Sequence, residues 1–214
     1  MTRWFHILCL GLLGLLLGGC IHLEQRIQIN PNGSGVVTYE YSVAEETFGT
    51  VAAGRMAIGG WQDPPVAGLN WFASERAVNE YSAGDEFEVQ QYRTTRQGAR
   101  RHVRIVVLAG DLQAALATGK IGDFRLDQTP EGNWRFHGAE PKMAAKKLSD
   151  AEVDKLRALC DDLWLRLIVV TPNPIVTATT KDREGTQATW LFDPGADDSF
   201  LRERPRIEVV YQSK

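Results

Sequence analysis

Three pairs of short segments, in which apolar residues alternate with polar ones, place the strongest constraint on the fold of this chain. A glycine-containing turn sequence separates the segments of each pair, which cover residues 23–29 and 37–43, 87–95 and 99–107, and 124–126 and 134–136. Apolar residues at every second position are typical of a strand with one buried face. Two such strands joined by a short turn pair with each other as a hairpin. The sequence therefore predicts a mainly antiparallel sheet built from hairpins.

The turn of the second pair decides which of its residues face the core. We expect residues 96–98 to form a three-residue loop, with Gly98 in the left-handed conformation. A two-residue loop would place the apolar residues of the two strands on opposite faces. In the expected register Tyr92 lies opposite His102, and both side chains point away from the core.

Signals for the start of a helix lie between the predicted strands. Ser42 with Glu45 and Ser149 with Glu152 fit the capping box, and Asp111 is suited to cap a further short helix. Further strands are predicted at residues 163–170, 175–180, 186–193 and 206–211. Strands in hairpins with two or three short helices make an α+β fold.

The first twenty residues have the pattern of a secretory signal. Arg3 precedes an apolar run over residues 5–17, and small residues follow the run. At about 1.5 Å per residue this run is too short to cross a hydrocarbon core of about 30 Å. Its end, Leu17-Gly18-Gly19-Cys20, resembles the lipobox of bacterial lipoproteins. That resemblance implies cleavage before Cys20, diacylglyceryl transfer to its thiol, and acylation of the new amino terminus with a chain such as palmitate.

This interpretation divides the chain into a signal peptide over residues 1–19 and a single soluble α+β domain over residues 20–214. Because two or more acyl chains give stable anchoring, we expect the domain to be tethered to a membrane through Cys20. Ile21 stands where an aspartate would resemble an inner-membrane retention signal. We therefore expect a cell-envelope location, at the outer membrane facing the periplasm if the source is Gram-negative.

The charge and the cysteine count exclude some classes of protein. Loss of Arg3 with the signal leaves 23 of the 24 Lys and Arg against 27 Asp and Glu, a net charge of −4. A chain with this balance has no general affinity for nucleic acid, so we expect no nucleic-acid partner. Cys160 is the one cysteine left besides Cys20, and we expect it to be a small buried apolar residue rather than a nucleophile.

The sequence contains no recognisable catalytic or metal-binding motif. His22, His102 and His137 lie in separate predicted strands without a ligand-spaced partner, and the chain has no nucleophile elbow or phosphate-binding loop. We therefore expect no catalytic residue, no metal and no cofactor. A cleft that holds a buried carboxylate near His102 or His137 would favour an enzyme instead.

Two features are candidates for ligand binding. The outward face of the second hairpin is expected to carry Tyr92, Arg100, His102 and Arg104, a strip suited to bind lipid phosphates or carboxylates. Such a strip is alternatively a charged edge that prevents sheets from aggregating.

The second feature is the loop over residues 58–72, which carries Trp61, Trp71 and Phe72 among glycines and prolines. These aromatic residues are suited to insert into a membrane interface or to cover an apolar pocket. The alternative is that the loop packs flat on the domain.

Two regions of the sequence resemble a known group. An apolar strand follows Cys20 and leads into Asn32-Gly33-Ser34-Gly35 and a second strand; near the end, residues 165–175 and 188–192 form the second region. These motifs resemble the LppM-type bacterial lipoproteins, whose function is unknown. The resemblance implies an anchored envelope domain, and it carries over no catalytic residue.

Three hypotheses about function follow. The first is a non-enzymatic, membrane-anchored envelope lipoprotein that binds a lipid, a glycolipid or an envelope partner protein. The second is a structural or assembly factor that docks other envelope proteins through exposed strand edges. The third is a hydrolase of cell-envelope substrates with a site assembled from dispersed residues.

Overall fold

The computed structural model describes residues 22–45, 75–84, 86–138, 149–159, 164–197, 199–202 and 205–213. One group of strands consists of β1 (His22–Ile29), β2 (Gly35–Ala44), β3 (Phe87–Gln97), β4 (Arg100–Ala109), β7 (Trp164–Val170), β9 (Arg183–Glu184) and β10 (Gln187–Phe192). The other group consists of β5 (Phe124–Gln128), β6 (Trp134–Gly138), β8 (Ile175–Ala178) and β11 (Glu208–Tyr211). The helices of these residues are α3 (Glu75–Ser82), α4 (Leu112–Ala117), α5 (Asp150–Leu159) and α6 (Ser199–Arg202).

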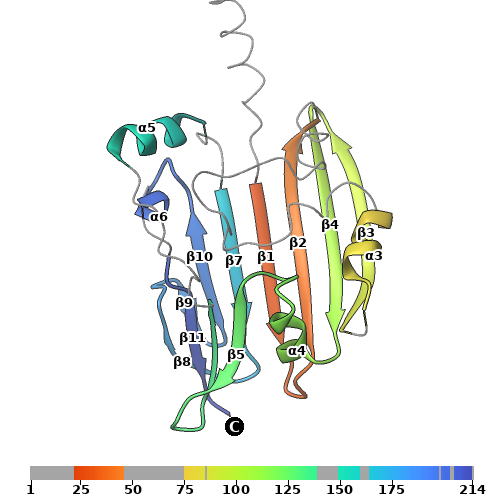
Figure 1. The fold of residues 1–214 in the computed structure, drawn as a ribbon, viewed down its shortest axis with the longest axis vertical. Helices are drawn as coiled ribbons and strands as arrows, with labels where there is room; N and C mark the ends of the chain where they lie inside the picture. Colours follow the sequence, from red (N-terminus) through yellow and green to blue (C-terminus); the bar gives the residue numbers. More distant parts are fainter. Residues whose placement is uncertain are drawn as a thin grey trace, which may run out of the picture.

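The strands form two sheets (Figure 1). The larger sheet has the order β3-β4-β2-β1-β7-β10-β9, and the smaller sheet has the order β5-β6-β11-β8. Neighbouring strands are antiparallel except for β1 and β7, which run parallel. The predicted α+β class with a mainly antiparallel sheet is confirmed, while α3 and α6 were not predicted.

The three predicted hairpins are β1–β2, β3–β4 and β5–β6. Gly33 and Gly132 each have φ of +85°, in the turns of the first and third hairpins. Only glycine adopts this left-handed conformation without a steric penalty, which explains why these turns form where they do.

The predicted register of the second hairpin is wrong. Gln97 pairs with Arg100, so the turn holds two residues, and Gly98 at its first central position has φ of +61°, as a type II′ turn requires. A β-bulge between Val89 and Gln91 inserts one extra residue into β3. The bulge shifts the alternation, so that Val89 and Tyr92 both face the core although their numbers differ in parity.

Two of the three predicted helix starts are confirmed. The Asp111 carboxylate accepts a hydrogen bond from the Ala114 amide at 3.0 Å, and α4 begins there. At the start of α5 the Ser149 amide donates to Glu152 at 2.8 Å. The expected capping role of Ser42 is wrong, because β2 continues through Ala44.

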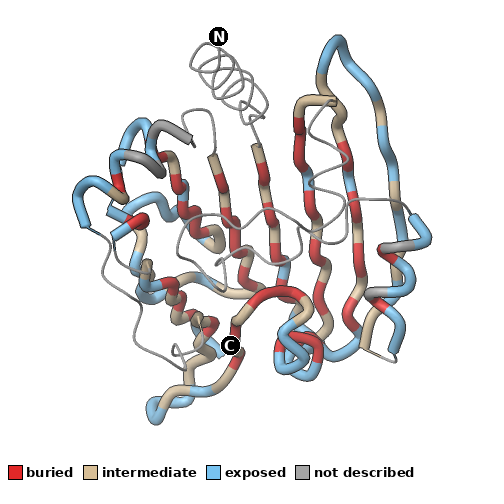
Figure 2. The backbone as a smooth tube through the Cα atoms, turned by 45° about the horizontal axis from the view of Figure 1, so that its top comes forward, coloured by how far each residue is buried: buried red, intermediate tan, exposed pale blue. Residues whose placement is uncertain are grey.

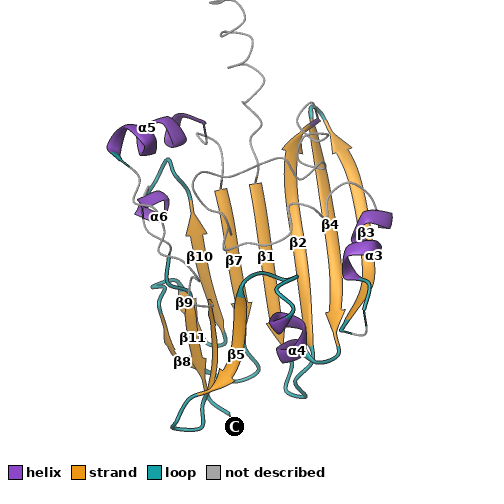
Figure 3. Ribbon diagram, in the orientation of Figure 1, coloured by secondary structure: helices purple, strands orange, loops and turns teal. Residues whose placement is uncertain are grey.

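The core lies between one face of the larger sheet and the elements that cover it. Buried residues alternate with less buried ones along the central strands (Figure 2). Helix α4 and strand β5 lie in front of the larger sheet (Figure 3). On that side the buried Gln25 amide donates to the Ile121 carbonyl at 2.7 Å, which ties β1 to the chain between α4 and β5. The opposite face of the larger sheet is here called the outer face.

Candidate functional site

The outer face of the larger sheet carries two rows of polar side chains that cross five strands. These rows follow from the strand register, because residues paired across neighbouring strands lie side by side on the same face. The charge row comprises Arg166, Glu24, Glu40, Arg104 and Arg93, from β7, β1, β2, β4 and β3 in that order. The histidine row, next to it, comprises Trp164, His22, Ser42, His102 and Thr95.

The charge row contains one cation more than its ion pairs use. Arg166 Nη1 lies 3.2 Å from Glu24 Oε2, and Arg104 forms an ion pair with Glu40. These pairs compensate the repulsion between the two carboxylates, which are directly opposed on β1 and β2. Arg93 is directly opposite Arg104 and has no acidic partner among the described residues. The row therefore ends in two directly opposed arginines, Arg104 on β4 and Arg93 on β3.

The histidine row adds aromatic surface and further hydrogen-bonding groups. The His22 and Trp164 rings stack with their centroids 5.0 Å apart, and the Arg166 guanidinium lies 5.1 Å from the Trp164 centroid. Arg100 donates to the Ser42 hydroxyl at 2.9 Å and to the Ser42 carbonyl at 3.1 Å. Ser42 thereby holds the Arg100 side chain across β2 and β4.

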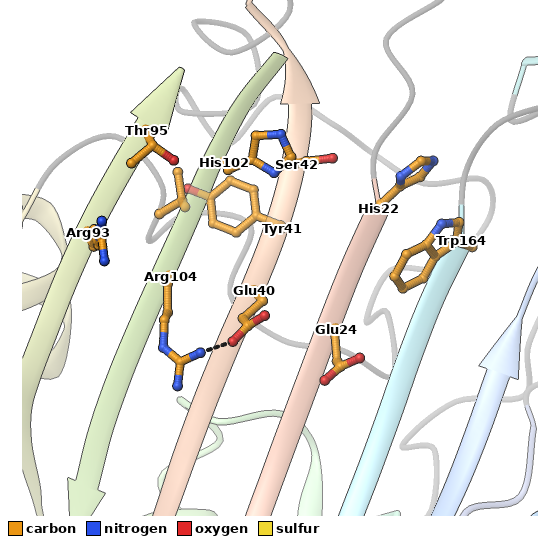
Figure 4. Close-up of a pocket in the computed structure, with 11 residues that line it drawn as sticks. His22, Glu24, Glu40, Tyr41, Ser42, Arg93, Thr95, His102, Arg104 and Trp164 are labelled. Carbon is orange, nitrogen blue, oxygen red and sulfur yellow. Dashed lines mark hydrogen bonds and ion pairs between the residues drawn. The ribbon is translucent and has the colours of Figure 1, made fainter. Parts of the chain in front are cut away.

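The histidine row and the charge row, apart from Arg166, line an open hollow of about 400 Å³. Figure 4 views it from the side opposite to Figure 1, and the Arg93, His102 and Arg104 side chains lie along its β3–β4 side. Both carboxylates of the hollow are ion-paired, whereas the cationic groups at this side are in surplus. Such an arrangement is suited to bind an anion, because guanidinium groups form charge-assisted hydrogen bonds with phosphate and carboxylate oxygens.

The structure places part of the predicted strip in this hollow. Arg100, His102 and Arg104 lie on the outer face, as predicted. The prediction for Tyr92 is wrong. The two-residue turn pairs Tyr92 with Ile105, where it packs against the core, and Thr95 takes the place opposite His102. Burial on that side raises the pKa of the Tyr92 phenol.

The half of the hollow that β1, β2 and β7 contribute was not predicted from the sequence. Glu24, Glu40 and Trp164 line it through pairings between segments far apart in the chain, and Arg166 lies next to Glu24 in the charge row. The alternation within β1 predicted the outward orientation of Glu24 but not its neighbours, and residues 163–170 were predicted only as a buried strand. Cys20, Cys160 and the loop residues Trp61, Trp71 and Phe72 lie outside the described residues.

A second hollow of about 460 Å³ lies at the opposite end of β1, beside the β1–β2 turn. Among the described residues that line it, Asp111 is the one that carries a charge, and its carboxylate already accepts the hydrogen bond that caps α4. This hollow therefore offers less charge for recognition than the hollow on the outer face.

The cluster around His137 tests the hypothesis of an enzyme. His137 Nε2 lies 3.0 Å from Asp127 Oδ2, and its Nδ1 lies 2.9 Å from the Gly138 carbonyl oxygen. Arg135 donates to both carboxylate oxygens of Asp127, at 2.9 and 3.0 Å. Because both imidazole nitrogens and the carboxylate are engaged in these bonds, this cluster has the geometry of a structural contact between β5 and β6.

This cluster gives a pH-dependent contribution to stability. The hydrogen bond from Arg135 lowers the pKa of Asp127 below its ordinary value of 3.8, and His137 lowers it further. A carboxylate with a lowered pKa stabilises the fold above the pKa that it has in the unfolded chain, and the contribution is lost as the pH falls through the folded-state pKa.

We therefore expect Asp127→Asn to lower the free energy of unfolding near neutral pH by about 1 kcal/mol or less, since the pair is partly exposed. The difference from the wild type should shrink as the pH falls from about 5 to 2, as measured by urea unfolding at a series of pH values. Arg135→Gln removes the main hydrogen-bond donor to Asp127, and it should also reduce the free energy of unfolding near neutral pH. A difference that is constant over this range would contradict the prediction.

No cluster of three His, Cys, Asp or Glu side chains within the described ranges is placed to hold a metal ion. None of the helices in this part of the chain is long and apolar enough to cross a membrane.

Comparison with known proteins gave matches among solved structures. No protein-family model matches the chain, and no curated protein sequence matches it. Among solved structures, the chain matches the NMR structure of the folded domain of LppM from Mycobacterium tuberculosis, with a TM-score of 0.45 and 10% sequence identity. The match covers 91% of each chain.

Proposed function

We propose that this protein is a lipid-anchored, non-enzymatic protein of the bacterial cell envelope, held through Cys20, whose domain binds the anionic headgroup of an amphiphilic ligand. The signal sequence that ends in Leu17-Gly18-Gly19-Cys20 supports the anchor. The hollow on the outer face supports the binding. With Ile21 after the cysteine, the proposed location in a Gram-negative cell is the outer membrane, facing the periplasm.

The opposed arginines carry the proposal for binding. Like charges directly across two strands destabilise a sheet, so the pairing of Arg93 with Arg104 costs free energy in the unliganded protein. Glu40 offsets this cost for Arg104 alone. A phosphate or carboxylate placed between the two guanidinium groups would relieve the repulsion and accept hydrogen bonds from both. His102, on the same face of β4, offers a further polar contact.

A binding role agrees better with the site than a catalytic one does. The two carboxylates among the described residues of the hollow, Glu24 and Glu40, are each engaged in an ion pair with an arginine. The carboxylate near His137 belongs to a bonded cluster on β5 and β6. Docking of other envelope proteins through the edge strands β3, β9, β5 and β8 stays a second hypothesis.

The test measures binding of short-chain phosphatidylglycerol by the purified full-length protein in detergent, with phosphatidylcholine of the same chain length as the neutral comparison. We expect Arg93→Gln to weaken phosphatidylglycerol binding about tenfold or more, because it removes a charge-assisted hydrogen bond. Arg76→Gln is the matched control, since Arg76 is exposed on α3 and pairs with Glu80 outside the hollow.

Equal affinity of the Arg93→Gln and Arg76→Gln variants for phosphatidylglycerol would contradict the assignment of the hollow. Equal affinity of the wild type for the two lipids would contradict recognition of an anionic headgroup.

A further inference from the structure

The second hollow, beside the β1–β2 turn, contains a buried tyrosine whose hydroxyl group has no partner among the described residues. Tyr211 of β11 lines this hollow, and the side chain is only 2% exposed. Its hydroxyl forms no hydrogen bond with a described residue, and burial raises the pKa of the phenol to about 12. The hydroxyl therefore keeps its proton at neutral pH. Because a polar group of a buried side chain costs free energy when it has no partner, a ligand that accepts this hydrogen bond would be stabilised.

Trp134 of β6 lies beside Tyr211 in this hollow. The two residues are directly paired in the smaller sheet, so their side chains lie on the same face, which packs against the core. Trp134 is partly buried and lines the hollow, so part of its surface stays uncovered by the core. The β1–β2 turn, α4 and the end of β11 lie at the same end of the molecule (Figure 1). The hollow at this end thus has two adjacent aromatic side chains, which offer an apolar surface with polar groups at its edge.

Side-chain amides from three separate segments also line the hollow. Asn32 belongs to the β1–β2 turn, Gln113 to α4, and Asn173 to the segment between β7 and β8. The Asn32 side-chain oxygen accepts a hydrogen bond from the Ser34 hydroxyl at 2.7 Å, and the Asn173 amide nitrogen donates to the Gln212 carbonyl at 3.0 Å. Among the described residues nothing bonds to the Asn32 amide nitrogen, the Asn173 side-chain oxygen or the Gln113 amide. These groups leave both donors and acceptors for a ligand.

These side chains favour a neutral ligand with hydroxyl groups. The Asp111 carboxylate, the one charge among the described lining residues, repels phosphates and carboxylates. A hydrocarbon chain would leave the Tyr211 hydroxyl and the amides without partners. A sugar ring meets both conditions, because its C–H face packs on aromatic rings and its hydroxyls both donate and accept hydrogen bonds, as side-chain amides do. The volume of about 460 Å³ is in the range of small-molecule sites.

We propose that this second hollow binds a neutral saccharide, with a sugar ring against Trp134 and a sugar hydroxyl that accepts a hydrogen bond from Tyr211. The site is separate from the hollow on the outer face. Glu24 lines that hollow and Ile29 lines this one, and the extended strand between these two residues spans about 17 Å. Their side chains also lie on opposite faces of the sheet. The inference therefore does not depend on the anionic ligand proposed above.

The experiment titrates two sugars into the purified full-length protein, in a zwitterionic detergent that carries no sugar itself. Tri-N-acetylchitotriose represents the glycan strand of a cell wall, and maltotriose represents the hexose headgroup of a glycolipid. The protein contains fluorinated tryptophan, and Trp134→Phe identifies the fluorine resonance of Trp134. We expect at least one of the sugars to shift this resonance along a saturable curve. The resonance of Trp164, which lines the hollow on the outer face, should stay in place.

Isothermal titration calorimetry of variants tests the assignment of the site. Tyr211→Phe removes only a hydroxyl without a partner, so the fold should keep its stability while saccharide binding weakens about fivefold, the effect of one hydrogen bond. Trp134→Leu removes aromatic surface and should weaken binding about tenfold or more. Tyr92→Phe is the matched control for the first variant, because Tyr92 lies in β3 and does not line this hollow. Its affinity for the sugar should equal that of the wild type.

Failure of both sugars to bind in the millimolar range would overturn the inference and leave the proposed function intact. Equal affinity of the Tyr211→Phe and Tyr92→Phe variants would refute the hydrogen bond from Tyr211. A sugar that shifts the Trp164 resonance and leaves that of Trp134 in place would bind in the hollow on the outer face, which would contradict the assignment.

Discussion

Replacing Cys20 with alanine is expected to abolish incorporation of labelled palmitate in bacterial cells that produce the full-length chain. The thiol of Cys20 is the acceptor of the diacylglyceryl group in the proposed processing, and alanine offers no nucleophile at that position. Because the cleavage also depends on this modification, the signal peptide over residues 1–19 should remain on the variant. Autoradiography and the intact mass of the purified protein measure both effects.

Cys160→Ala provides the matched control, since it removes the other cysteine of the mature chain. This variant should be labelled and cleaved as the wild type is. Palmitate on the Cys20→Ala variant, or a wild-type mass with an unmodified Cys20, would contradict the proposed anchor.

The second large effect is expected for Phe136→Ala in the core. Phe136 in β6 is fully buried, and the centroid of its ring lies 5.0 Å from the ring centroid of Phe124 in β5. Both belong to the hydrophobic cluster that also includes residues of the larger sheet. Truncation of a buried phenylalanine costs about 3–5 kcal/mol, through lost burial and the cavity that it leaves. A domain is stable by about 5–15 kcal/mol, so this loss is a large part of the total.

Thermal unfolding followed by circular dichroism measures the loss. Leu191→Ala is the control, because Leu191 is an apolar side chain on β10 that is 53% exposed. Its truncation should change the free energy of unfolding by about 0.5 kcal/mol or less. A similar loss of stability in the two variants would contradict a common core between the sheets.

Interactions between residues close in sequence were predictable. The turns that contain Gly33 and Gly132 and the caps at Asp111 and Ser149 depend on contacts within a few residues, and the structure contains all four. The cap predicted at Ser42 is absent, because pairing with β4 extends β2 past Ser42 to Ala44. Here the free energy of strand pairing exceeds that of a local helix start.

The bulge in β3 shows how a single residue changes a predicted surface. It lies in a polar segment, and no glycine or proline marks its position. Alternation without the bulge places Tyr92 on the outer face, and alternation with it places Tyr92 against the core. Arg100, His102 and Arg104 were assigned to the correct face, since β4 pairs without interruption with β2.

The sequence by itself determined the hairpins, two helix starts and the alternation that directs cations to one face of β4, because each depends on neighbours along the chain. Tertiary structure alone decided that β1 lies parallel to β7, which brings Arg166 to Glu24 across 142 positions of sequence. It thereby decided which charges are neutralised and which remain in excess beside Arg93. Such pairings depend on the burial of whole strand faces, and no short stretch of sequence carries that free energy.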